Sequence, residues 1–149
     1  MCIRDRIQDL GLQSKVKIYQ WMPHEKFIQM IRSCHVFIFP SFRDGGGAVV
    51  VEAMASGKPV ICLDIGGPGF HIQKEWGTKI SPKNPEYVIQ EMAKALEKLH
   101  LNKDLHTKMG EAARKRAEEF YLWDRLGERL QEIYEQALPN TETNRAESI

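Results

Sequence analysis

The segment from Asp44 to Glu52 holds the residues whose types and spacing are best suited to chemistry. It starts with a carboxylate, continues with Gly45, Gly46 and Gly47, and then enters an apolar stretch that contains a second carboxylate. Glycines let a phosphate approach the backbone closely, and the N-terminus of a helix carries about half a positive charge. The pattern predicts a binding site for an anion, and the alternative interpretation is a flexible surface turn.

Each of the two carboxylates has two interpretations. Glu52 is flanked by Val51 and Ala53, and an uncompensated carboxylate in apolar surroundings is costly. It therefore needs hydrogen-bond donors, which ribose hydroxyls would supply, unless it is partly exposed or bonded to backbone amides. Asp44 can reach a sugar hydroxyl from the loop, or it can cap the turn that follows it.

Hydrophobic periodicity predicts the elements that hold this segment in place. Strand, helix and strand alternate at short intervals, which predicts a doubly wound, Rossmann-like α/β domain with a parallel sheet. The expected strands are 16–19, 35–39, 58–63 and 78–80, and the expected helices are 24–34, 48–56 and three longer helices after Asn84.

Two glycine-rich segments, 44–47 and 66–69, directly follow expected strands, and both are predicted to be loops. Ligands of parallel sheets bind at the carboxyl ends of the strands. We therefore expect the two loops to line one crevice.

Length and composition fit one soluble globular domain, with 149 residues, 42% hydrophobic and 28% charged. We assign the domain to residues 7–138 and expect it to be truncated at its N-terminal side. The polar, aperiodic segment 139–149 is expected to be a disordered tail, and residues 1–6 are given no structural role.

Composition also limits the kinds of partner. The net charge of +1 gives no broad field for nucleic acid or anionic membrane, so a bound anion needs a local site. No apolar run approaches the ~18 residues of a transmembrane segment. Cys34 and Cys62 are expected to be buried in a reducing compartment, which favours the cytoplasm. The histidines lack metal-ligand spacing, and His71, close to the second glycine segment, is assigned no role.

An ordered set of motifs resembles the donor-site signature of retaining glycosyltransferases of the GT-B fold, family 4. The motifs are Pro40-Ser41, Asp44-Gly45, the run from Glu52 to Ile61, and Gly66-Gly67. The resemblance extends from about Leu10 to Leu138 and implies the C-terminal, nucleotide-sugar-binding half of such an enzyme.

The resemblance also implies roles for single residues. Asp44 would contact hydroxyls of the transferred sugar and Glu52 would bind the nucleotide ribose, as the two catalytic-site acids. The family usually has glutamate followed by Gly-Phe-Gly at the first position, so Asp44 has a shorter reach. Backbone near Trp21 and Met22 would contact the nucleobase. The residues expected at the diphosphate are Gly45, Gly46, Gly47, Ala48 and Val49.

By the same resemblance, the whole protein would transfer a hexose from a UDP- or GDP-sugar to a glycan or lipid-linked acceptor, with retention and without a metal or other cofactor. A preceding N-terminal domain would bind the acceptor, so this chain alone is expected to be inactive. The protein is expected in the cytoplasm, with peripheral association at the inner face of the membrane. The alternatives are a non-catalytic nucleotide-sugar-binding module or subunit that needs a separate N-terminal partner, and a GT-B-fold nucleotide-sugar epimerase.

Overall fold

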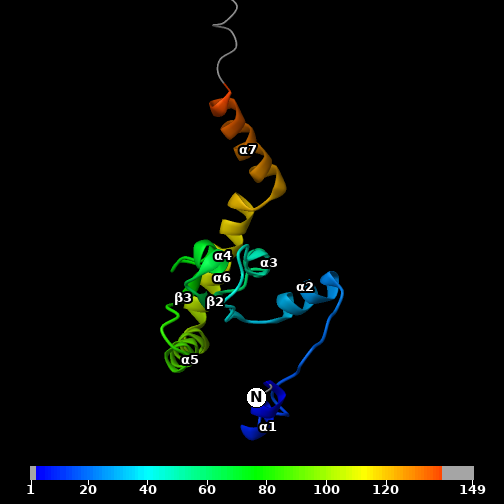
Figure 1. The fold of residues 1–149 in the computed structure, drawn as a ribbon, viewed down its shortest axis with the longest axis vertical. Helices are drawn as coiled ribbons and strands as arrows, with labels where there is room; N and C mark the ends of the chain where they lie inside the picture. The colour runs from blue at the N-terminus through cyan, green and yellow to red at the C-terminus, as the bar shows by residue number, and fades with distance from the viewer. Residues whose placement is uncertain (1–2, 139–149) are drawn as a thin grey trace, which may run out of the picture.

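The computed structural model describes residues 3–138, in which a small parallel sheet lies between helices (Figure 1). The strands are β1 (Phe37–Phe39), β2 (Val60–Leu63) and β3 (Gly77–Ile80). The helices are α1 (Ile3–Asp9), α2 (His24–Ser33), α3 (Ala48–Ala55), α4 (Gly66–His71), α5 (Pro85–Leu101), α6 (Lys103–Phe120) and α7 (Trp123–Ala137).

The sheet has the order β1-β2-β3, and both strand pairs are parallel. Val60 is aligned with Phe37 on one side and with Gly77 on the other. All four residues of β2 are buried, as expected for a continuous apolar strand that is covered on both faces. The predicted parallel α/β architecture is confirmed.

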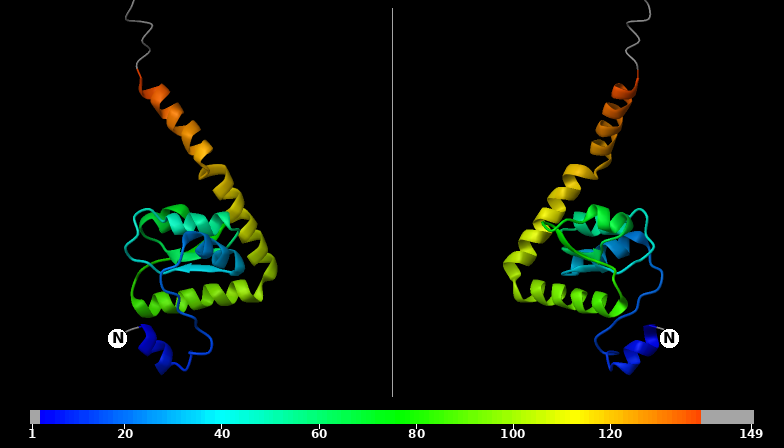
Figure 2. Two further views of the ribbon diagram at one scale, coloured as in Figure 1. Left: turned by 90° about the vertical axis from the view of Figure 1, so that its right-hand side faces the viewer. Right: turned by 60° about the vertical axis from the view of Figure 1, so that its left-hand side comes forward.

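The central strand separates two apolar layers. Val60 and Cys62 belong to a core cluster with α3 and α6, whereas Ile61 and Leu63 belong to a second cluster with α5. This alternation follows from the two-residue period of a strand. Figure 2 shows α5 on one side of the sheet and α3 and α4 on the other, so the domain is doubly wound as predicted.

Helix α3 forms although three consecutive valines are poor helix formers. Its N-cap, Gly47, has φ 66° and ψ 24°, a left-handed conformation that glycine adopts without a steric penalty. Val50, Ala53 and Met54 are completely buried. Burial of this face overrides the low intrinsic propensity and fixes where the helix begins.

The strand predicted at 16–19 is wrong, because the segment forms no strand in the structure. Val16, Ile18 and Tyr19 are exposed, and the chain between α1 and α2 runs outside the layered core (Figure 1). A strand needs a neighbour for its backbone hydrogen bonds, and within 3–138 none lies beside this segment. The N-terminus also differs, since α1 begins at Ile3.

The second glycine-rich segment is partly helical, and its assignment as a loop is corrected. Helix α4 begins at Gly66 and includes Gly67, Pro68 and Gly69, which are all buried. A Cβ atom at Gly69 would lie 2.9 Å from the Asp64 carbonyl carbon. Close backbone packing, rather than helix propensity, therefore requires glycine at 67 and 69.

The three C-terminal helices follow the prediction. Asn84 caps α5, since its side chain accepts from the amide of Tyr87 at 2.8 Å, and Pro85 occupies the first turn. Helix α7 has no buried residue and projects away from the sheet (Figure 1). The predicted tail, 139–149, lies outside the described residues.

Candidate functional site

The two glycine-rich segments meet beyond the carboxyl ends of β1 and β2. The amide of Gly67 donates to the carbonyl of Asp44 at 3.1 Å. A Cβ atom at Gly67 would lie 2.5 Å from the carbonyl carbon of Gly46, so only glycine permits this approach. The structure thus brings the two segments together, while the crevice that they are expected to line stays a prediction.

The Asp44 carboxylate lies within the first segment and caps its turn. Its Oδ1 accepts a hydrogen bond from the amide of Gly47 at 2.5 Å. This contact corresponds to the turn-capping interpretation, which the sequence left open beside the sugar-binding one. The Gly47 amide, expected at a diphosphate, is therefore occupied by a side chain of the same loop.

Several amides at the N-terminus of α3 have no hydrogen-bond acceptor in the described part of the chain. The amides of Val50 and Val51 donate to the Gly47 carbonyl at 2.9 and 3.3 Å. Within residues 3–138, the structure gives no acceptor for the amides of Gly45, Gly46, Ala48 and Val49. Unpaired amides and the helix dipole make this end of α3 suitable for an anion.

Glu52 lies about one turn into α3 and has a partner that the sequence did not reveal. Its Oε1 lies 2.8 Å from Nε2 of His24, the first residue of α2, and the Glu52 side chain is 33% exposed. The carboxylate is thus partly exposed and paired with a side chain rather than with backbone amides. No local pattern connects two residues that lie 28 positions apart.

His71, at the end of α4, is the second residue that sequence reasoning missed. Its Nε2 lies 2.8 Å from the Gly46 carbonyl oxygen, and its Nδ1 lies 2.8 Å from the hydroxyl of Tyr121. The only signal in the sequence was its position just after the second glycine segment. The structure places this imidazole directly against the first segment.

Trp21 and Met22, expected near a nucleobase, lie in the extended segment before α2. The Trp21 side chain is exposed and Met22 is partly buried. The structure thus leaves the indole accessible, while its contact with a base stays a prediction.

Comparison with known proteins assigns this arrangement to a family. The family model of the group 1 glycosyl transferases matches residues 2–116. The chain belongs to the group 1 glycosyltransferases.

Relatives of this glycosyltransferase chain are much longer. The D-inositol 3-phosphate glycosyltransferase of Corynebacterium jeikeium is 30% identical over 133 residues, which cover 89% of this chain and 30% of the relative. The sucrose synthase of Melioribacter roseus is 34% identical over 96 residues, or 64% of this chain and 12% of the relative. The chain thus spans less than a third of either relative.

Solved glycosyltransferase structures share the fold. The sucrose-phosphate synthase of Thermosynechococcus elongatus has a TM-score of 0.77 at 25% identity, covering 91% of this chain and 33% of that structure. The C-terminal domain of a group 1 family protein (LpcC) from Francisella tularensis has a TM-score of 0.71 at 21% identity, covering 80% and 60%. The chain has the fold of a GT-B C-terminal domain.

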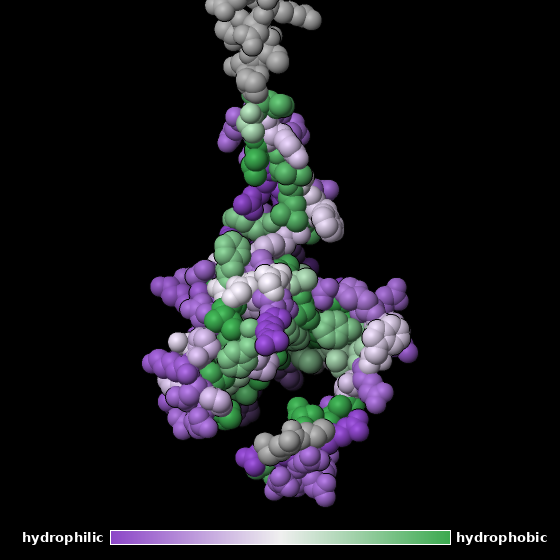
Figure 3. Space-filling model, in the orientation of Figure 1, coloured by the Kyte–Doolittle hydropathy of each residue, from purple (hydrophilic) through white to green (hydrophobic). Residues whose placement is uncertain are grey.

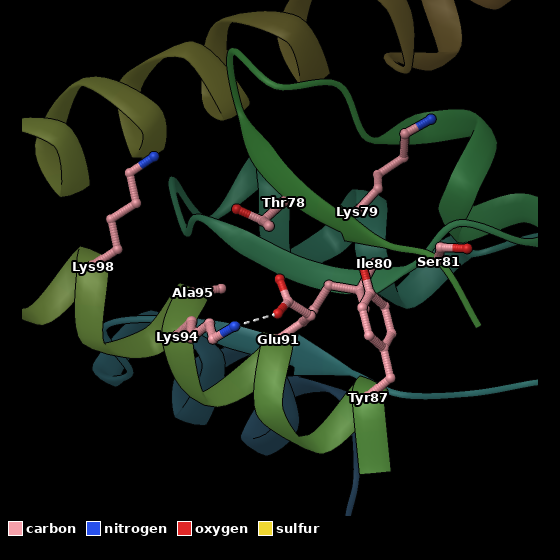
Figure 4. Close-up of a pocket in the computed structure, with 9 residues that line it drawn as sticks. All are labelled: Thr78, Lys79, Ile80, Ser81, Tyr87, Glu91, Lys94, Ala95 and Lys98. Atoms are coloured by element: carbon pink, nitrogen blue, oxygen red, sulfur yellow. Dashed lines mark hydrogen bonds and ion pairs between the residues drawn. The ribbon is translucent and has the colours of Figure 1, made fainter. Parts of the chain in front are cut away.

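Two hollows of this glycosyltransferase domain lie away from the predicted site. A hollow of about 230 Å³ lies beside the contact of β3 with α5, where Glu91 pairs with Lys94 at 2.7 Å (Figure 4). Lys79, at its rim, is bonded to the Asp64 carboxylate at 2.9 Å. The other hollow, of about 750 Å³, lies between the start of β1 and helices α5 and α6. Neither is lined by a residue predicted to bind donor.

The cysteines differ from one another, in part against expectation. Cys62 is buried in β2, and burial raises the pKa of its thiol to about 12. Cys34 is exposed, which corrects the prediction that both are buried, because it follows the last turn of α2 rather than lying in a strand. No helix among residues 3–138 is long and apolar enough to span a bilayer.

Proposed function

We propose that this chain is the donor-binding domain of a retaining glycosyltransferase, which transfers a hexose from a UDP- or GDP-sugar to a hydroxyl of a glycan or lipid-linked acceptor. The observation that carries the proposal is the group of unpaired amides at the start of α3, beyond the strands, with Glu52 about one turn further on. Membership of the glycosyltransferase family supports a nucleotide sugar as the ligand.

The diphosphate binds at the amides of Gly45, Gly46, Ala48 and Val49 in this proposal. As the glycosidic bond breaks, negative charge grows on the departing diphosphate and positive charge grows on the sugar. Fixed amide dipoles directed at the diphosphate then stabilise the transition state more than the ground state. The binding of this leaving group is the catalytic contribution that we assign to the loop.

The two carboxylates bind the two sugars of the donor. Glu52 keeps Oε1 on His24, and its second oxygen accepts from a ribose hydroxyl. Asp44 binds hydroxyls of the transferred sugar, and the nucleobase lies near Trp21 and Met22. We assign no metal to the site, as the family resemblance implies, and the amides and the helix dipole offset part of the diphosphate charge.

Acceptor binding is assigned to a preceding domain of the whole protein. This chain spans 30% of its inositol phosphate glycosyltransferase relative, and two-domain enzymes position their substrates between the domains. We therefore expect donor binding without transfer from this chain alone. We place the whole protein in the cytoplasm, at the inner face of the membrane when its acceptor is lipid-linked.

Titration calorimetry of the chain with a panel of UDP- and GDP-sugars tests the proposal. We expect the wild type to bind at least one of them, and Glu52→Ala to bind it at least tenfold more weakly, or about 1.4 kcal/mol. Glu91→Ala is the matched control, because Glu91 is also 33% exposed and also ion-paired, but on α5. Equal affinities of the wild type and Glu52→Ala would remove Glu52 from the site.

A further inference from the structure

The Gly46–Gly47 peptide group is held at both of its ends. Its carbonyl oxygen, on Gly46, lies 2.8 Å from Nε2 of His71, and its N–H, on Gly47, donates to Asp44 at 2.5 Å. This peptide directly precedes α3. The orientation of this peptide plane determines where the Gly47 N–H points, which in the structure is toward the Asp44 carboxylate.

The hydrogen bonds of His71 fix which ring nitrogen carries the proton. A carbonyl oxygen can only accept, so Nε2 must donate to Gly46. In the neutral ring Nδ1 is then an acceptor, and the Tyr121 hydroxyl donates a hydrogen bond to it at 2.8 Å. Tyr121 follows the last residue of α6, so the imidazole connects the loop to the end of that helix.

We infer that His71 is a positioning residue of the donor site. It holds the Gly46–Gly47 peptide so that the Gly47 N–H points toward the Asp44 carboxylate, and Tyr121 orients the imidazole. The inference rests on the proposed function. If a sugar hydroxyl displaces the Gly47 amide from Asp44, that amide becomes a further donor to the diphosphate. Among residues 3–138, His71 is then the one side chain that still bonds to the peptide.

Glycine makes such a hold necessary. A Gly-Gly peptide rotates more easily than others, because glycine adopts positive and negative φ about equally. Rotation would exchange the N–H for the Gly46 carbonyl oxygen, which repels a phosphate. A bond from Nε2–H to that oxygen opposes the rotation.

The imidazole also packs, so a positioning role must be separated from a structural one. Its ring lies edge-on to Tyr121 at 5.1 Å and to Phe70 at 5.4 Å. Removal of the ring would disturb these contacts whatever its hydrogen bonds do. The test therefore needs a variant that loses the ring but keeps the donor.

We would compare His71→Leu, His71→Gln and Tyr121→Phe with the wild type. Glutamine places an amide N–H near the position of Nε2, whereas leucine offers no donor. His100→Leu is the matched control, because His100 is exposed on α5, away from the loops. Each variant is measured by amide NMR of Gly46 and Gly47 without ligand, and by calorimetry with the sugar nucleotide that the wild type binds.

We expect His71→Leu to displace the Gly46 and Gly47 amide resonances and to weaken donor binding at least fivefold. His71→Gln should restore affinity to within about twofold, Tyr121→Phe should fall between them, and His100→Leu should change nothing. Unchanged loop resonances in His71→Leu, or equal losses of affinity in the leucine and glutamine variants, would overturn the inference. If no sugar nucleotide binds the wild type, while His71→Leu displaces the loop resonances and His71→Gln restores them, the proposed function fails and the hold on the peptide is supported.

Discussion

At the scale of single residues, the candidate site depends on side-chain pairs that join separate elements. His24 brings the first residue of α2 to the Glu52 carboxylate on α3, and His71 brings the end of α4 to the Gly46 carbonyl. Both imidazoles contact groups that we expect to face the donor. We expect them to act on the orientation of the site more than on the stability of the fold.

His24→Ala tests this distinction. The His24 and Glu52 side chains are 68% and 33% exposed, and exposed ion pairs contribute about 0–1 kcal/mol. We expect the free energy of unfolding, measured by urea denaturation, to fall by less than about 1 kcal/mol, while donor affinity falls severalfold because Glu52 loses its orientation.

Lys94→Ala is the matched control for that variant. The Lys94–Glu91 pair has the same exposures, 68% and 33%, but lies on α5. It should show the same small change in stability and no change in donor affinity. Equal donor affinities of His24→Ala and the wild type would mean that the imidazole does not orient Glu52.

At the scale of elements, the start of α3 depends on one backbone conformation. Gly47 has φ 66° and forms the N-cap, and its carbonyl accepts from the amides of Val50 and Val51. The residue thereby directs the unpaired amides of the first turn. Its neighbours in the loop carry no such constraint.

Gly47→Ala should therefore destabilise the fold where Gly46→Ala does not. A Cβ atom at Gly47 would lie 3.0 Å from atoms of Gly67, Pro68 and His71, and the left-handed conformation alone costs a non-glycine residue about 1–2 kcal/mol. We expect urea denaturation to show a loss of at least about 1 kcal/mol. A Cβ atom at Gly46 meets nothing within 4 Å, so its replacement should cost less than about 0.5 kcal/mol. Equal stabilities would mean that α3 does not need this cap.

At the scale of the whole molecule, α7 is an amphipathic helix beside a separately packed core. Its apolar side chains form a stripe along the projecting helix (Figure 3). They are exposed, and they include Trp123 at 87% and Ile133 at 60%. The sheet and its two layers therefore owe little of their stability to this helix.

Deletion of residues 123–149 tests that independence. The truncation removes the contact of Arg129 with the Phe120 ring, at 5.5 Å, which is an exposed cation–π pair of about 0.5–1 kcal/mol. Urea denaturation should show a loss of no more than about 1 kcal/mol. Leu99→Ala, in the core, should cost about 2–5 kcal/mol in the same assay and shows its sensitivity. A comparable loss on truncation would mean that α7 packs on the core in solution.

The sequence by itself determined the parallel α/β architecture and the meeting of the two glycine-rich segments. Periodicity and end signals are local, so β2 and the cap of α5 by Asn84 could be predicted from neighbouring residues alone. The helical α4 could not be predicted, because Gly67 is required by contact with Gly46 rather than by helix propensity.

Only the tertiary structure decided whether a locally suitable segment finds its partner. The segment 16–19 has the pattern of a strand, but a strand forms only where a neighbour accepts its hydrogen bonds. Glu52 and the Gly46 carbonyl are hydrogen-bonded to imidazoles that lie 28 and 25 positions away in the sequence. Such pairs depend on how separate elements pack, which no local period of the chain records.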